Sequence, residues 1–335
     1  MQFVADQLEH VAWEGFHFYD LIFPLFVFLM GAASVFSLER TVQKYGKATA
    51  YKKIFRRAVL LYVIGLIYYG GLSRDGGPVM FRFVGVLQRI AICYLFAGLI
   101  LLNFRVRGIA IISASILLGY WALLAFVPVP GVGAANYNEG TNLVNWVDIH
   151  YLPGYKWDGD WDPEGLLSNL PAIVSALLGT FAGMILRNST FSHSGRVLCL
   201  FAAGIVCLLI GNLWGTQFPS VEKLYFPIIK KLWTSSYVLV AGGWSYLLIG
   251  FFYLVIDVWK FDIWARPFVW IGMNSITIYV LYELISFPDI VRRFLHPATL
   301  ELIAPYGDLV VSLLALGLAV GLCFELYRKK LFLRV

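Results

Sequence analysis

The sequence predicts an all-α protein, a polytopic membrane helix bundle of about nine transmembrane helices. Of its 335 residues 60% are hydrophobic and only 14% are charged, whereas about 25% of the residues of a soluble domain are charged. The mean hydropathy is +0.75, and apolar runs recur near the ~20 residues that cross a bilayer. Aromatic residues make up 17% of the chain and gather near the ends of these runs, as interfacial aromatic belts do. We therefore treat residues 1–335 as a single transmembrane domain.

The apolar runs divide the chain in order. The first predicted span, 19–38, follows a beginning with no Lys or Arg before residue 10, so a cleavable signal peptide is not expected. The second, 58–72, is short for a bilayer. The remaining spans are predicted at 84–104, 108–127, 166–186, 197–214, 234–256, 267–287 and 309–327. The four cysteines all lie within apolar runs and suggest neither disulfides nor a metal site.

The charges of the connections predict the orientation. Lys and Arg are retained on the cytoplasmic side of a membrane. Alternate connections, counted from the one after the first span and including the C-terminal tail, hold about twice as many of them as the other side. The C-terminus is therefore expected in the cytoplasm and the N-terminus outside, as in a multi-pass protein of a bacterial inner membrane. The net charge of +6 then reflects topology, and no nucleic-acid partner is expected.

Ionisable residues gather where the first span begins. If this stretch is helical, His10, Glu14 and His17 are spaced i, i+4 and i+7 and share one stripe, with Asp20 close behind. Ionisable side chains at the mouth of a membrane helix are costly to place, which favours a functional role. A metal site is not favoured, because the stretch has no His pair at i, i+4 and no further ligands nearby.

The outer connection 128–165 combines acidic and aromatic residues, among them Trp161, Asp162 and Glu164. Aromatic rings stack on the apolar faces of sugars and carboxylates accept hydrogen bonds, so the connection suits a hydroxylated or amino-bearing ligand. An interfacial belt with solvating charges is the alternative. Asp162, just before Pro163, also has the pattern of a helix N-cap.

Further polar residues lie in or beside apolar runs. Lys231 and Ser235 flank the start of span 234–256, where they would either meet an anionic group or, for Ser235, cap the helix. Arg89 and Asn274 lie inside predicted spans and need partners in the bundle interior, either a ligand or another side chain. Pairs of glycines at GxxxG spacing indicate close helix packing, within one chain or in a homo-oligomer.

A series of short blocks resembles the heparan-alpha-glucosaminide N-acetyltransferase family of membrane acyltransferases. The blocks occur in the family's order over nearly the whole chain, at 10–15, 20–24, 85–89, 161–166, 231–236 and 272–275. The family's first helix, with its Ser-Leu-Asp-x-x-Arg-Gly type motif, has no counterpart here, so we expect the chain to start one helix late. Glu14 stands where relatives often have Asn.

The resemblance implies transfer of an acetyl group from cytoplasmic acetyl-CoA to the amine of a glucosamine-type sugar on the outer side. It makes His10 the catalytic base or acetyl carrier. Glu14, four positions along, would orient the imidazole, and Asp20 completes the predicted catalytic group. Candidates for substrate binding are Trp161, Asp162, Glu164, Arg89, Lys231, Ser235 and Asn274. The last three are also the candidates for stabilising the oxyanion. Candidates for the acetyl-CoA phosphates, which topology also explains, are Lys52, Lys53, Arg56 and Arg57.

Two other functions stay open at the level of the sequence. A sugar or glycan-precursor transporter would use Arg89, Asn274 and Glu283 to line a path, although no symmetry between two halves is evident. A non-catalytic scaffold would bind no acetyl-CoA. The partners expected under the leading interpretation are membrane lipid and an amino sugar or glycan.

Overall fold

The computed structural model describes residues 2–68, 81–217, 224–295 and 306–332. These residues form helices and connections, and the only β-pairing among them consists of isolated bridges. The all-α prediction is therefore confirmed. By packing, the chain divides into two compact units, Met1–Leu254 and Val255–Val335. The single functional domain inferred from the sequence stays a prediction.

Within the described ranges, 7 helices are long and apolar enough to cross a membrane. The expected count of nine is not confirmed, for two local reasons. The predicted second span forms the end of α3 (Lys47–Leu66), whose first half is strongly basic, and its residues 69–72 lie outside the described part. The predicted span 267–287 is divided at Asn274 into α10 (Arg266–Met273) and α11 (Ser275–Leu284), each too short to span.

Helix α7 (Asn169–Arg187) is the centre of the first unit. It packs against α2 (Ile22–Tyr45), α4 (Val86–Asn103) and α9 (Ser235–Phe252), and its apolar side chains are buried almost all round. A Cβ atom at Gly31 of α2 or Gly179 of α7 would lie under 3.0 Å from backbone atoms of the facing helix. The two glycines therefore allow the backbones to meet. For Gly179 this is the packing role predicted from its GxxxG spacing to Gly183.

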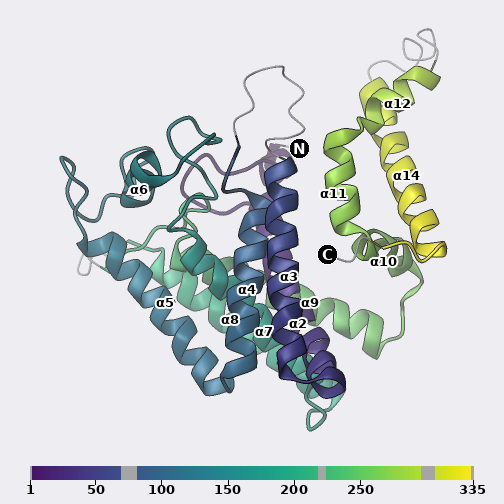
Figure 1. The fold of residues 1–335 in the computed structure, drawn as a ribbon, viewed down its shortest axis with the longest axis horizontal. Helices are drawn as coiled ribbons and strands as arrows, with labels where there is room; N and C mark the ends of the chain where they lie inside the picture. Colours follow the sequence, from purple (N-terminus) through teal and green to yellow (C-terminus); the bar gives the residue numbers. More distant parts are fainter. Residues whose placement is uncertain (1, 69–80, 218–223, 296–305, 333–335) are drawn as a thin grey trace. The chain divides into compact units, whose positions relative to one another are not determined.

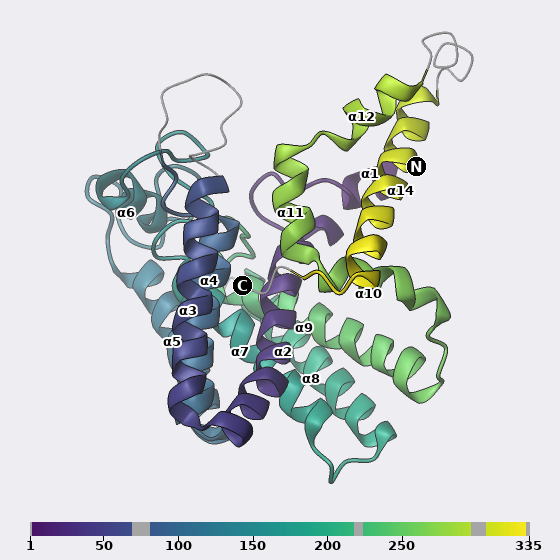
Figure 2. The same ribbon diagram turned by 45° about the vertical axis from the view of Figure 1, so that its right-hand side comes forward.

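The remaining long helices of this unit surround that core. Helix α3 lies on α4, α5 (Val106–Phe126) lies on α7, and α8 (His193–Trp214) lies along α9. Figures 1 and 2 show the α2–α3, α4–α5 and α7–α8 connections at one end of the unit and the segment with α6 (Leu143–Tyr151) at the other. The numbers of Lys and Arg in the connections predict the same grouping, with these three connections on one side and 128–165 on the other. Which end faces the cytoplasm stays a prediction.

The second unit has a small core of its own. Helix α9 continues into a π-helical turn, Tyr253–Val258. Beyond it, α12 (Phe287–Phe294) and α10 pack on α14 (Gly307–Arg328), with Phe287, Val291 and Val311 buried together.

Candidate active site

The segment that carries His10 is not a helix. After the short helix α1 (Gln2–Gln7) the chain runs through turns and bends to a 3₁₀ turn at Phe18–Leu21. Gly15, at φ +127°, donates its N–H to the carbonyl of Ile228 at 2.9 Å, and Glu14 forms a β-bridge with Ile229. The expected stripe of His10, Glu14 and His17 is therefore wrong, because backbone pairing with a distant segment sets this conformation.

Asp20 and Lys230 are the charged neighbours of His10. Nδ1 of His10 lies 2.8 Å from Oδ1 of Asp20. Nζ of Lys230 lies 3.2 Å from the same carboxylate oxygen, and 2.8 and 3.2 Å from the Nδ1 and Nε2 atoms of His10. The side chains of His10, Asp20 and Lys230 are 51%, 1% and 24% exposed. The three groups thus form a compact cluster with a buried carboxylate below and the imidazole at the surface.

Asp20 is held firmly below the imidazole. Its Oδ2 accepts hydrogen bonds from the backbone N–H groups of Val11 at 3.3 Å and His17 at 3.1 Å, and its carbonyl accepts the hydroxyl of Tyr237 at 2.8 Å. A buried carboxylate with its acceptor sites filled keeps one orientation. Its Oδ1 is thereby aimed at His10, where it favours the tautomer with the proton on Nδ1.

Glu14 does not take the role expected of it. Its carboxylate accepts a hydrogen bond from the hydroxyl of Tyr225, and its backbone pairs with Ile229. The partner that orients His10 is therefore Asp20, ten positions along the chain rather than four.

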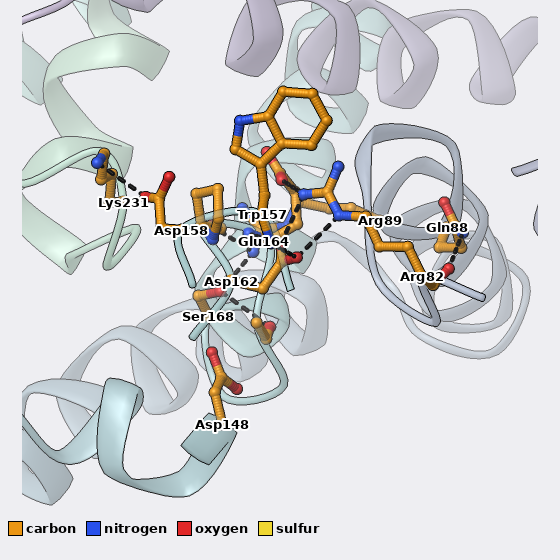
Figure 3. Close-up of polar contacts among 12 residues, drawn as sticks. Arg82, Gln88, Arg89, Asp148, Trp157, Asp158, Asp162, Glu164, Ser168 and Lys231 are labelled. Carbon is orange, nitrogen blue, oxygen red and sulfur yellow. Dashed lines mark hydrogen bonds and ion pairs between the residues drawn. The ribbon is translucent and has the colours of Figure 1, made fainter. Parts of the chain in front are cut away.

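A buried ion pair joins two distant parts of the chain beside this cluster. Nε and Nη2 of Arg82 donate to the two carboxylate oxygens of Asp162 at 2.8 and 2.7 Å, and Nη2 also donates to Glu164 at 2.6 Å (Figure 3). The side chains of Arg82 and Asp162 are 3% and 0% exposed. Asp162 also accepts the N–H groups of Trp157 and Glu164 at 3.0 and 2.9 Å. It is thus fully engaged in structure, and it does not cap α7, whose N-cap is Ser168.

Glu164 is the least enclosed member of this group, with 14% of its side chain exposed. Burial raises the pKa of its carboxyl, against the opposing effect of Arg89 and Arg82. Its charge also acts on Lys230, whose pKa is lowered by burial while Asp20 and Glu164 oppose the change. Glu164 and the His10 cluster therefore share one electrostatic environment.

Arg89 lies in the bundle interior, as its position predicted, with 1% of the residue exposed. Nη2 donates to the Ser168 hydroxyl and, at 3.4 Å, to the carbonyl of Pro163. Its guanidinium lies over the ring of Trp233, 4.6 Å from the centroid. Its Nε and Nη1 make no hydrogen bond to any described residue, so this cation retains capacity for an acceptor.

The aromatic wall beside these charges comes from the outer connection. The ring of Trp161, a residue only 6% exposed, stacks edge-on against Trp13 with centroids 5.9 Å apart. Lys231 pairs with Asp158 at 2.8 Å (Figure 3). It also pairs with Glu139 at 3.2 Å and lies over the Trp161 ring, 5.1 Å from the centroid. Although burial opposes it, these two ion pairs raise the pKa of Lys231. Lys231 therefore links the segment after Ile229 to the outer connection that carries Trp161.

Two other predicted site residues have structural partners. Ser235 is fully buried and donates to the carbonyl of Leu117 at 2.8 Å, and the helix cap belongs instead to its neighbour Thr234. Asn274 lies in the second unit, where it ends α10 and its amide donates to the carbonyl of Trp270 at 3.1 Å.

The basic residues predicted for acetyl-CoA lie at the opposite end of α2. Nζ of Lys53 donates to the hydroxyls of Ser37 at 2.7 Å and Thr41 at 3.2 Å. These positions are about 25–30 Å along α2 from Asp20 at 1.5 Å per residue. Arg57, one turn after Lys53 on α3, lies over the ring of Tyr94, 4.7 Å from its centroid. The other two residues predicted for acetyl-CoA, Lys52 and Arg56, are exposed.

Sequence reasoning missed two members of the site. Neither Lys230 nor Arg82 is among the residues that the sequence predicts for the site. Arg82 pairs with Asp162 80 positions away, a separation for which a single sequence holds no signal. Among the described residues no group of three His, Cys, Asp or Glu side chains could hold a metal ion.

Comparison with known proteins decides the family. The family sequence profile described as "Heparan-alpha-glucosaminide N-acetyltransferase, catalytic" matches residues 1–208. The chain belongs to the heparan-alpha-glucosaminide N-acetyltransferase family. The resemblance predicted from short blocks is thereby confirmed, and the matched region contains His10, Asp20, Arg82, Asp162 and Glu164.

Two curated members of the family have clear similarity to the chain. Heparan-alpha-glucosaminide N-acetyltransferase of Mus musculus is 29% identical over 383 aligned residues, which cover 98% of this chain and 56% of the mouse protein. The protein of the same name from Homo sapiens is 28% identical with the same coverage. The chain therefore spans just over half the length of these relatives.

Proposed function

We propose that the chain is a transmembrane acetyltransferase of a bacterial inner membrane that transfers acetyl from cytoplasmic acetyl-CoA to the amine of a glucosamine-type sugar on the other side. The observation that carries the proposal is the His10–Asp20 pair at 2.8 Å in a chain of this family. With Nδ1 directed to Asp20, Nε2 is the ring nitrogen that would accept a proton, and Nζ of Lys230 lies 3.2 Å from it.

The pair supports acyl transfer in two forms. In direct transfer, the sugar amine attacks the thioester carbonyl, Nε2 of His10 takes the amine proton, the C–S bond breaks and CoA leaves as the thiol. In the carrier form, Nε2 itself attacks and forms an N–C bond as the CoA sulfur leaves, and the amine then takes the acetyl group from the imidazole. Both forms use Nε2, and both develop negative charge on the carbonyl oxygen.

Lys230 suits the stabilisation of that oxygen better than the three residues expected from the sequence. Its ammonium lies 3.2 Å from Nε2, whereas the ammonium of Lys231 pairs with two carboxylates and the hydroxyl of Ser235 bonds to a backbone carbonyl. The side-chain amide of Asn274 donates to the carbonyl of Trp270 at 3.1 Å. A cation fixed beside the reacting carbonyl lowers the barrier without reorganisation during the reaction.

We propose that Glu164 binds the amine of the sugar. Arg89 would donate a hydrogen bond to an oxygen atom of the substrate. Glu164 has an exposed edge within the electrostatic environment of Lys230, and a carboxylate attracts a sugar ammonium. Arg89 has two N–H groups without a described partner. Trp161 and Asp162 then build the wall and the loop that carry these groups, rather than contacting the sugar.

For the donor, we propose that Lys53 and Arg57 rather than Lys52 and Arg56 meet the phosphates of acetyl-CoA. The first two face neighbouring helices at the end of α2 remote from His10. The separation of about 25–30 Å along α2 matches the ~30 Å hydrocarbon thickness of a bilayer. The donor would thus bind at one face and react near the other.

The test is acetyl transfer from radiolabelled acetyl-CoA to glucosamine by the purified full chain. His10→Ala should abolish transfer, whereas His17→Ala, seven positions along the same segment with its ring on the carbonyl of Glu9, should retain it. Undiminished transfer by a folded His10→Ala variant would overturn the assignment. Label that stays on the protein without acceptor, and is absent from His10→Ala, would identify the carrier form.

A further inference from the structure

An apolar groove runs down the outside of the first unit, apart from the His10 cluster. It has a volume of about 630 Å³, within the ~300–1,000 Å³ typical of small-molecule sites. Helices α3, α4, α5 and α7 contribute to its walls, together with residues 83–84 and 152–153. The main apolar lining is Ile92, Phe96, Ile100, Ile116, Leu170 and Ile173.

The geometry of the lining is that of a channel parallel to the helices. Ile92, Phe96 and Ile100 follow one another at intervals of four, so they form one stripe of α4. The stripe extends for about 12 Å at 1.5 Å per residue. Phe96 and Leu170 are 46% and 44% exposed. On helices long and apolar enough to cross a membrane, such side chains face hydrocarbon.

Two polar residues, Asn169 and Tyr62, interrupt this lining. Asn169 is 7% exposed, and its Nδ2 donates to the carbonyl of Gly165 at 2.8 Å. Its Oδ1 accepts no hydrogen bond from any of the described residues. The other polar residue of the groove, Tyr62, donates its hydroxyl to the carbonyl of Phe83 at 2.8 Å. A buried amide oxygen without a partner costs free energy unless a ligand supplies a donor.

We propose that this groove binds the acyl chain of a membrane lipid, and that Asn169 Oδ1 accepts a hydrogen bond from a hydroxyl or N–H group at the polar end of that lipid. Water would be poorly accommodated by walls of Ile, Leu and Phe, whereas a hydrocarbon chain regains the lost contacts. Because Asn169 lies at the first residue of α7, the polar end of the lipid would lie at the same end as the outer connection.

The bound lipid would brace the loops of the site. Phe83 follows Arg82 directly, and Leu166 and Asn169 follow Glu164 by two and five positions. Nδ2 of Asn169 also donates to the carbonyl of Glu164 at 3.5 Å. The inference does not depend on acetyl transfer, because it concerns lipid binding by the folded chain.

The test compares two photoreactive lipids with identical diazirine acyl chains on the purified full chain. Phosphatidylglycerol has hydroxyl donors in its headgroup, whereas phosphatidylcholine has none. We expect labelled peptides within 83–100 and 166–173, with phosphatidylglycerol favoured about fivefold, the factor for one hydrogen bond. Asn169→Ala should remove that preference. Labelling spread evenly over the outer faces of α5 and α8 would overturn the proposal. The same preference for phosphatidylglycerol in Asn169→Ala and in the unaltered chain would also overturn it.

Groove-filling variants give an independent readout. Leu170→Trp should reduce the lipid retained in native mass spectra about tenfold, because the larger ring occupies the channel. The matched control is Leu118→Trp on α5, a residue 54% exposed outside the groove, which should retain lipid. Ile92→Trp fills the same channel from α4 and replaces Leu170→Trp if that variant does not fold. Unchanged retention in a folded groove-filling variant would refute the proposal.

Discussion

Asp20→Asn is the sharpest test of the chemistry proposed for His10. The substitution keeps the size of the side chain and one oxygen for the N–H groups of Val11 and His17, which lie at 3.3 and 3.1 Å from Oδ2. The amide NH₂ then replaces Oδ1, 2.8 Å from Nδ1 of His10. Because NH₂ is a donor, Nδ1 must accept, and the proton moves to Nε2. The nitrogen that should take the amine proton is then occupied.

The loss of charge adds to the tautomer effect. With Nζ of Lys230 3.2 Å from Oδ1 of Asp20, the Coulomb attraction is on the order of 5 kcal/mol at an effective dielectric constant of ~20. Without it, the ammonium of Lys230 faces the imidazole alone and opposes its protonation during the reaction. Loss of general-base function typically costs about 10²–10⁴ in rate, or roughly 3–5 kcal/mol of transition-state stabilisation. We expect kcat to fall by that factor.

The assay is steady-state acetyl transfer at varied acetyl-CoA and varied pH. We expect kcat to drop while the KM for acetyl-CoA stays within about threefold of that of the unaltered chain. The KM should change little because the phosphates of acetyl-CoA bind away from Asp20. The double variant Asp20→Asn/Lys230→Met should be less impaired than the sum of its parts, since it removes the unpaired ammonium. A folded Asp20→Asn variant with more than about a third of the original kcat would refute the reasoning, because no general base would then be missing.

Three other outcomes follow from the charges. Arg82→Met leaves Asp162 buried without its cation and should lower stability by about 3–5 kcal/mol, seen as a lower melting temperature in detergent; an unchanged value would contradict the buried pair. Burial raises the pKa of Asp148 from 3.8 to about 6, so the folded state binds this proton more tightly than the unfolded state. Stability should therefore fall by up to about 3 kcal/mol as pH rises from ~4 to ~6, and melting curves of Asp148→Asn should lack that slope. Lys53→Ala should raise the KM for acetyl-CoA about tenfold, whereas Lys44→Ala, exposed at the same end of α2, should not; equal effects would point to topology alone.

The residue that orients His10 shows where reasoning from one sequence fails. The sequence favours Glu14, because a helix would place it one turn from His10. The segment instead consists of turns and bends, and Gly15 and Glu14 pair with Ile228 and Ile229 more than 200 positions away. Asp20, also in the predicted catalytic group, takes the place of Glu14.

The sequence by itself determined the all-α membrane class, the family and the grouping of the connections at two ends. These properties follow from local composition, charge and short blocks, which need no long-range contacts. Only the tertiary structure decided which polar residues meet. Arg82 pairs with Asp162, 80 positions along the chain, and Lys230 contacts His10, 220 positions away. A helix break at Asn274 divides an apolar run that looks continuous in the sequence. Such pairings depend on packing between distant helices and loops, and a single sequence does not record that packing.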